Sequence, residues 1–264
     1  MQFPASPHLE NRIMPSTFSI APRPSTRKFL LGCVLPMLCA AWTSNAARAE
    51  DLPAVKIVLA GDSTVTDNAG WGQAFAELLK PPAVCVNLAR SGRSTKSFYD
   101  EGQWKKVLAE KPNYVLIQFG HNDQPGKGPE RETDPATTYR TNLVRYITEA
   151  RAAGAKPILV TSLCRRVYTA EGKIRPDQLP YVDAMRAVAA EQKVPLVDLY
   201  AASVELAERL GPEGSKAFGP AHPKIAGAVD GTHLSSAGAK EHAPLIAAAL
   251  ATAEPSLRPY LKTP

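Results

Sequence analysis

The sequence contains little cysteine and no set of side chains with metal-ligand spacing, and both shortages exclude classes of function. Only four cysteines occur among 264 residues, and no two of them form the Cys-x-x-Cys pattern of zinc and redox sites. His121 and Asp123 lie two residues apart and His242 stands alone, so the His-x-x-x-His spacing of a metal site is missing as well. We therefore expect no metal and no other cofactor.

Residues 50–264 have almost no excess of positive charge, because most of the excess lies in the first 49 residues. The whole chain has 31 Lys and Arg against 25 Asp and Glu. Residues 1–49 contain five of the basic residues and one of the acidic residues, which leaves 26 against 24 in residues 50–264. Nucleic-acid-binding surfaces need clustered Lys and Arg, so we expect no nucleic-acid partner.

The first 49 residues have the pattern of a secretory signal peptide. Arg27 and Lys28 precede the apolar stretch Phe29–Trp42, and a small-residue A-x-A site ends at Ala49. The stretch is shorter than the roughly 20 residues that span a bilayer. We expect cleavage after Ala49, export to the periplasm or the medium, and no lasting membrane association.

Two alternatives remain open in this segment. Translation from Met14 is a second possible start, and "LLGC" ending at Cys33 resembles a lipoprotein cleavage site. In every case we expect residues 50–264 to fold as a single domain, because about 215 residues suffice for one well-buried core.

Residues 50–264 alternate between apolar runs rich in β-branched residues and segments with helical spacing. The apolar runs are Val55–Ala60, Ala83–Leu88, Tyr114–Phe119, Pro157–Ser162 and Val194–Leu199. The helical segments are Gly72–Lys80, Gln103–Lys111, Pro135–Ala153, Pro180–Gln192 and Ser235–Ala253. This alternation is typical of βαβ units, in which helices cover both faces of a parallel sheet. It predicts a three-layer α/β/α sandwich.

Two segments are too long to be simple connections, residues 120–133 and about 211–231. Long loops in compact domains are often functional. The first directly follows the third apolar run, and ligands bind open parallel sheets beyond the carboxyl ends of the strands. We therefore expect a functional site at that edge of the sheet.

Four short polar clusters occupy positions that suit such a site. Gly-Asp-Ser (61–63) follows the first apolar run, ARSGRS (89–94) the second and GHND (120–123) the third, while DGTHLS (230–235) precedes the last helix. A serine nucleophile needs a base, usually His, and a carboxylate that orients the base. The oxyanion that forms needs fixed N–H donors. Each cluster alone is an ordinary turn or helix cap, but the ordered set predicts a serine hydrolase.

These clusters resemble, in order, the blocks of the SGNH hydrolases, also called GDSL esterases, from Ala60 to Gly238. "GDST", "GWG", "SGRSTKSF" and "IQFGHND" resemble the rhamnogalacturonan acetylesterase branch of that family. The resemblance implies that Ser63 is the nucleophile, His233 the base and Asp230 the orienting carboxylate. It also implies that Gly92 and Asn122 join the N–H of Ser63 in the oxyanion hole. We expect a flavodoxin-like sheet of five parallel strands in the order 2-1-3-4-5.

Five further residues are candidates for substrate contact, the last two of them in CRRVY (164–168) after the fourth apolar run. They are His121, Asp123, Trp71, Arg165 and Arg166, of which the two arginines would suit an acidic sugar. Each also has a structural interpretation, such as core packing for Trp71 or a solvated pair for the arginines. Asp62 is expected to brace the turn that presents Ser63.

The expected strand order also bears on Cys85 and Cys164, which remain after cleavage. It separates the second strand, at an edge, from the fourth by two intervening strands. Bridged cysteines need Cα atoms within about 7 Å of each other. We therefore expect free thiols.

The sequence as a whole predicts an exported, monomeric serine esterase that removes O-acetyl groups from a plant cell-wall polysaccharide. The resemblance favours pectic rhamnogalacturonan as the substrate. Two alternatives stay open: an acetylxylan esterase or other carbohydrate or lipid esterase of the same superfamily, and a non-catalytic carbohydrate-binding protein on the same fold.

Overall fold

Five parallel strands form one sheet in the order β2-β1-β3-β4-β5, as the sequence predicts. The computed structural model describes residues 52–262, and the predicted signal peptide lies outside the described residues. The strands are β1 (Val55–Gly61), β2 (Ala83–Asn87), β3 (Tyr114–Gln118), β4 (Lys156–Val160) and β5 (Leu196–Val197). The central strand β1 pairs in register with both neighbours, so that Leu59 lies opposite Asn87 and Leu116.

Successive side chains of the central strands enter two different cores, one on each face of the sheet. Ile57 and Leu59 of β1 belong to one buried cluster, whereas Val58 and Ala60 belong to the other. Because both faces are covered, the strands are apolar throughout instead of alternating with polar residues.

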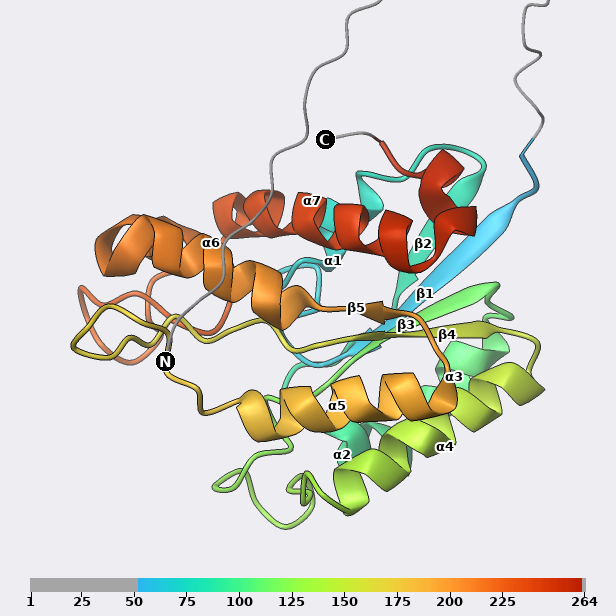
Figure 1. Ribbon diagram of the computed structural model, residues 1–264, viewed down its shortest axis with the longest axis horizontal. Coiled ribbons are helices and arrows are strands. Elements are labelled where there is room, and N and C mark those ends of the chain that lie inside the picture. The colour runs from blue at the N-terminus through green and yellow to red at the C-terminus, as the bar shows by residue number, and fades with distance from the viewer. Residues whose placement is uncertain (1–51, 263–264) are drawn as a thin grey trace, which may run out of the picture. The chain divides into compact units, whose positions relative to one another are not determined.

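The helices supply the outer layers of this sandwich (Figure 1). The first core packs against α1 (Gly72–Ala76), α6 (Leu199–Gly214) and α7 (Ser236–Ala253). The second core packs against α2 (Thr95–Asp100), α3 (Gln103–Ala109), α4 (Thr138–Ala152) and α5 (Leu179–Gln192). Two 3₁₀ helices, η1 (Ser215–Phe218) and η2 (Pro255–Tyr260), complete the described chain. No helix within residues 52–262 is both long enough and apolar enough to cross a membrane.

The fifth strand is shorter than the predicted run Val194–Leu199. Pro195 has no N–H to donate to a sheet, and Asp198 accepts the N–H of Ala201 as the N-cap of α6. Only Leu196 and Val197 remain between them. The local chemistry at both ends therefore limits the strand to two residues.

Other boundaries differ too: α1 and α3 end at Ala76 and Ala109, before the predicted Lys80 and Lys111, and α2 was not predicted. Helix α4 begins at Thr138 and not at Pro135, because the side chain of Asp134 accepts the N–H groups of Ala136 and Thr137 in a turn before the helix. Helix α6 continues into the predicted second loop as far as Gly214, across a kink at Gly211, whose φ is 69°. The second long loop is therefore shorter than expected.

Both cysteines of the described chain are free thiols. Cys85 lies on the edge strand β2, and Cys164 follows β4, so three strand spacings of about 4.8 Å separate the two strands. Burial raises the pKa of Cys85 to about 12, with a smaller contribution from Asp67. Burial also raises the pKa of Cys164. Both thiols therefore resist ionisation in the folded protein.

We predict that a chain of residues 50–264 reacts slowly with Ellman's reagent when folded, because thiolate is the reactive form. After unfolding without reductant, both thiols should react. Absence of reactive thiol in the unfolded protein would show that Cys85 and Cys164 form a disulfide.

Candidate active site

Ser63, His233 and Asp230 form one continuous hydrogen-bonded chain. His233 Nε2 lies 2.9 Å from Ser63 Oγ, although the two residues are 170 positions apart in the sequence. His233 Nδ1 lies 2.7 Å from Asp230 Oδ2. When Nδ1 donates its proton to the carboxylate, the lone pair of Nε2 faces the serine hydroxyl. This geometry allows the imidazole to take the proton of Ser63.

Residues 230–233 form a small turn that orients the imidazole. Asp230 Oδ1 accepts the N–H of Thr232 at 2.7 Å and the N–H of His233 at 3.0 Å. Burial would raise the pKa of Asp230, but the hydrogen bonds from His233 and Thr232 hold it below its usual value. The carboxylate is therefore ionised at neutral pH and can stabilise a protonated imidazole.

Asp62 stabilises the turn that carries Ser63, as the sequence predicts. Asp62 Oδ1 accepts the N–H and the hydroxyl of Thr64 at 2.9 and 2.7 Å. Thr64 Oγ1 accepts Nε2 of Gln118 at 2.6 Å, and Gln118 Oε1 accepts the indole N–H of Trp71 at 2.8 Å. Trp71 is 1% exposed. These contacts make Trp71 a support for the serine turn.

Gly92 and Asn122 lie on the loops after β2 and β3, the two strands that flank β1. Gly92 has a φ of 77°, which glycine adopts without strain. Asn122 Nδ2 donates to the carbonyl of Arg93 at 3.1 Å, so it connects the two loops. The assignment of both residues to the oxyanion hole stays a prediction.

His121 forms a second pair with an aspartate, but this pair is buried. His121 Nδ1 lies 3.4 Å from Asp62 Oδ2, and the histidine is 3% exposed. Its Nε2 faces Nε2 of Gln178 at 3.1 Å, while Gln178 Oε1 accepts the N–H of Arg165. The amide nitrogen of Gln178 is thus the donor in this contact, and Nε2 of His121 accepts. The pair holds two loops together.

The charge on Asp62 fits this arrangement. Burial would raise the pKa of Asp62, but His121 and the hydrogen bonds from Thr64 lower it below its ordinary value. Asp62 Oδ1 accepts the two donors of Thr64, whereas Asp62 Oδ2 lies 3.4 Å from His121 Nδ1 without a hydrogen bond between them.

Asp123 is fully buried and serves as a brace between loops. It accepts the N–H of Thr95 at 3.1 Å, the hydroxyl of Thr95 and, at 3.0 Å, the hydroxyl of Thr133. Burial raises the pKa of Asp123 to about 7, even though the threonine hydrogen bonds act in the opposite direction. The carboxyl group thereby ties the start of α2 to the loop after β3.

Four of the five residues predicted to contact substrate are buried, and their role in substrate contact stays a prediction. Trp71, His121, Asp123 and Arg166 are between 0 and 9% exposed, and each has partners within the protein. Arg165 is partly exposed, and its guanidinium contacts Gln124 and the carbonyl of His121. Reasoning from the sequence missed the roles of Gln118, Gln178 and Thr95. Gln118 and Thr95 lie within the motifs IQFGHND and SGRSTKSF, but a motif does not show which partners its side chains bind.

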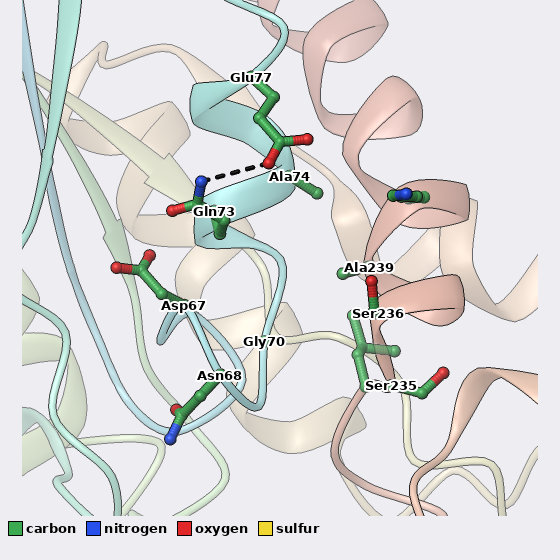
Figure 2. A pocket seen from close by; sticks show the side chains of 11 residues that line it. Asp67, Asn68, Gly70, Gln73, Ala74, Glu77, Ser235, Ser236 and Ala239 are labelled. Atoms are coloured by element: carbon green, nitrogen blue, oxygen red, sulfur yellow. Dashed lines mark hydrogen bonds between the residues drawn. The ribbon is translucent and has the colours of Figure 1, made fainter.

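A hollow of about 220 Å³ lies between α1 and the start of α7, next to the turn of residues 230–233. Figure 2 shows Asp67, Asn68, Gln73, Glu77 and Ser236 around it, with Gln73 donating to Glu77. These carboxylate, amide and hydroxyl groups suit a ligand rich in hydroxyl groups. Residues 52–262 contain no group of three or more His, Cys, Asp or Glu side chains arranged to hold a metal ion.

The raised pKa of Asp123 predicts a pH-dependent stability. Between about pH 4 and 7 the folded protein keeps Asp123 protonated while the unfolded chain ionises it, so this contribution to stability is present below pH 4 and lost as pH rises to 7. In the native protein, the free energy of unfolding should fall by an amount on the order of a few kcal/mol between about pH 4 and 7. We predict that this fall is absent in Asp123→Asn, because the asparagine side chain stays neutral.

Urea unfolding at several pH values measures this effect. Asp100→Asn, which changes an exposed carboxylate on α2, is the matched control and should leave the pH dependence unchanged. Parallel pH profiles for the native protein and Asp123→Asn would contradict the prediction.

Comparisons with known proteins agree with the site's motifs. A model of the GDSL-like lipase/acylhydrolase family matches residues 57–240. Rhamnogalacturonan acetylesterase RhgT of Bacillus subtilis (strain 168) is 41% identical over 208 residues, covering 73% of this chain and 88% of RhgT. A second protein of that organism, "Probable rhamnogalacturonan acetylesterase YesY", is 38% identical over 199 residues, covering 72% of this chain and 90% of YesY.

A solved structure extends the comparison to the fold. The crystal structure of YxiM from Bacillus subtilis superposes with a TM-score of 0.65 at 27% identity and covers 76% of this chain. This chain spans only 57% of the YxiM chain. With the family model matching well over half of its residues, the chain belongs to the GDSL-like lipase/acylhydrolase family and is a carboxylic ester hydrolase.

Proposed function

We propose that this protein is an exported serine esterase that removes O-acetyl groups from pectic rhamnogalacturonan by an acyl-enzyme mechanism. The observation that carries the proposal is the hydrogen-bonded chain from Ser63 through His233 to Asp230, at 2.9 and 2.7 Å. It supplies a nucleophile, a base and an orienting carboxylate in one geometry.

In the first step, the Oγ atom of Ser63 attacks the acetyl carbonyl carbon while His233 Nε2 takes the hydroxyl proton. The negative oxygen that forms is stabilised by N–H donors from Ser63, Gly92 and Asn122. The carbon–oxygen bond to the sugar then breaks, and the imidazolium gives its proton to the leaving sugar oxygen. The acetyl group stays on Ser63.

In the second step, a water molecule attacks the acetyl carbon and gives a proton to His233 Nε2. The bond to Ser63 breaks, the serine oxygen regains a proton from the imidazolium, and acetic acid leaves. Asp230 stays ionised throughout and stabilises the protonated imidazole. The reaction needs only water besides the ester.

The substrate assignment is supported by the relatives RhgT and YesY, whose names describe rhamnogalacturonan acetylesterases and which align over about nine-tenths of their own length. The hollow beside residues 234–236 adds support, because Asp67, Asn68 and Gln73 in its lining offer hydrogen bonds to sugar hydroxyl groups. The proposal that the enzyme is exported rests on the basic, apolar and small-residue pattern of residues 27–49.

Ser63→Ala should lower kcat for p-nitrophenyl acetate by more than about 1000-fold, because the acyl-enzyme cannot form. Stopped assays of p-nitrophenol release measure this. Ser256→Ala is the control, since its hydroxyl contacts Tyr114 and Glu254 near η2 and should leave the rate unchanged. An unchanged rate in Ser63→Ala would remove Ser63 from the mechanism.

A panel of acetylated polysaccharides tests the substrate. We predict that acetate is released faster from acetylated rhamnogalacturonan than from acetylated xylan or mannan. The reason is that RhgT and YesY, the relatives described above, are both named as rhamnogalacturonan acetylesterases. Enzymatic measurement of free acetate, with Ser63→Ala as the blank, gives the rates. Faster release from xylan would replace the pectic assignment with the acetylxylan alternative.

A further inference from the structure

Arg166 contacts three consecutive parts of the turn that carries the imidazole. Its Nη2 donates to the carbonyl of Asp230 at 2.8 Å and to the carbonyl of His233 at 2.6 Å. Its backbone N–H donates to the carbonyl of Gly231 at 2.7 Å. One residue thus holds both ends and the middle of the turn of residues 230–233.

The guanidinium of Arg166 is buried without a carboxylate partner. The residue is 9% exposed, and none of the ion pairs within residues 52–262 includes it. Its Nη1 atom is buried with no hydrogen-bond partner among the described residues. Burial of a charge is costly unless the charge is paired, so an apolar side chain would suit fold stability better. The contribution of Arg166 is instead the pair of hydrogen bonds to the carbonyl groups of Asp230 and His233.

The segment that carries Arg166 is itself fixed to the loop after β3. The N–H of Arg165 donates to Gln178 Oε1 at 2.7 Å, and its Nη2 donates to the carbonyl of His121 at 3.1 Å. His121 in turn faces Asp62, next to Ser63. The two neighbouring arginines therefore reach in opposite directions, Arg165 toward the serine side and Arg166 toward the histidine side.

We propose that Arg166 is a positioning residue for ester hydrolysis, which holds the carbonyl groups of Asp230 and His233 and thereby keeps the imidazole at Ser63. This inference rests on the proposed function. Because a displacement of about 1 Å in such a site can lower the rate about 100-fold, loss of this hold should reduce kcat. It should do so equally for acidic and neutral substrates, since a residue that only positions the imidazole acts on every ester alike.

The test compares Arg166→Ala and Arg166→Lys on p-nitrophenyl acetate and on acetylated rhamnogalacturonan oligosaccharides. We expect Arg166→Ala to lower kcat about 100-fold on both substrates, with KM for p-nitrophenyl acetate changed less than about 3-fold. Arg166→Lys, which keeps the charge and can reach a carbonyl, should lose about 10-fold.

Added guanidinium at non-denaturing, millimolar concentration should restore part of kcat in Arg166→Ala. It has a route to the site, because Arg166, Asp230 and Gly231 line a surface hollow of about 410 Å³. Arg151→Ala is the matched control. Arg151 Nη2 donates to the carbonyl of Gln192 at 2.8 Å, away from the site, so this variant should keep wild-type kcat and not respond to guanidinium.

Two results would overturn the inference. One is wild-type kcat for Arg166→Ala on p-nitrophenyl acetate, and the other is a loss confined to KM for the acidic oligosaccharide, which would make Arg166 a substrate-binding residue. If Arg166→Ala does not fold, as judged by circular dichroism, wild-type kcat in Arg166→Lys overturns it. Activity in Ser63→Ala would instead refute the proposed function, so the two failures are distinguishable.

Discussion

The contact between His233 and Ser63 is the constraint on which the site depends, and the sheet alone does not provide it. Ser63 follows the central strand β1, so its position is fixed by pairing on both sides. His233 lies in a connection between η1 and α7 and is anchored to no strand. Its turn is fixed by main-chain contacts, including Leu234 N–H to the carbonyl of Ala69 and Ser235 N–H to the carbonyl of Phe218, besides those of Arg166.

Several polar side chains are buried beneath the site, at the carboxyl ends of the strands. Asp62, His121 and Asp123 are almost fully buried, and each connects segments that follow different strands. The hydrogen bonds in this network allow few alternative arrangements of these segments, although Asp62 Oδ2 and His121 Nδ1 have no hydrogen-bond partner among the described residues. The network therefore limits how far the serine turn and the loop after β3 can move relative to each other. Such fixed geometry is what electrostatic stabilisation of an oxyanion requires.

The sequence predicted the sheet, and it predicted that Ser63, His233 and Asp230 come together, as they do. Apolar runs identified all five strands, because a parallel strand covered on both faces has a recognisable composition. The three residues could be singled out because a nucleophile, a base and a carboxylate each need a particular residue type, and their catalytic roles stay a prediction. The sequence did not predict burial: Trp71 lies in the GWG motif and Arg166 follows the fourth apolar run, and only the tertiary structure shows that both side chains are buried.

The same reasoning explains why an arginine holds the histidine turn. A turn without strand pairing presents carbonyl groups that must find donors when they are buried. Apolar side chains can cover such a turn but cannot fix the direction of its carbonyl groups. A guanidinium has five N–H groups in a rigid plane, so one side chain can hold two carbonyl groups at once, as Arg166 does with Asp230 and His233. If His233 is the base, as proposed, a hydrolase with its base on a loop gains from such a donor the rigidity that a strand would otherwise give.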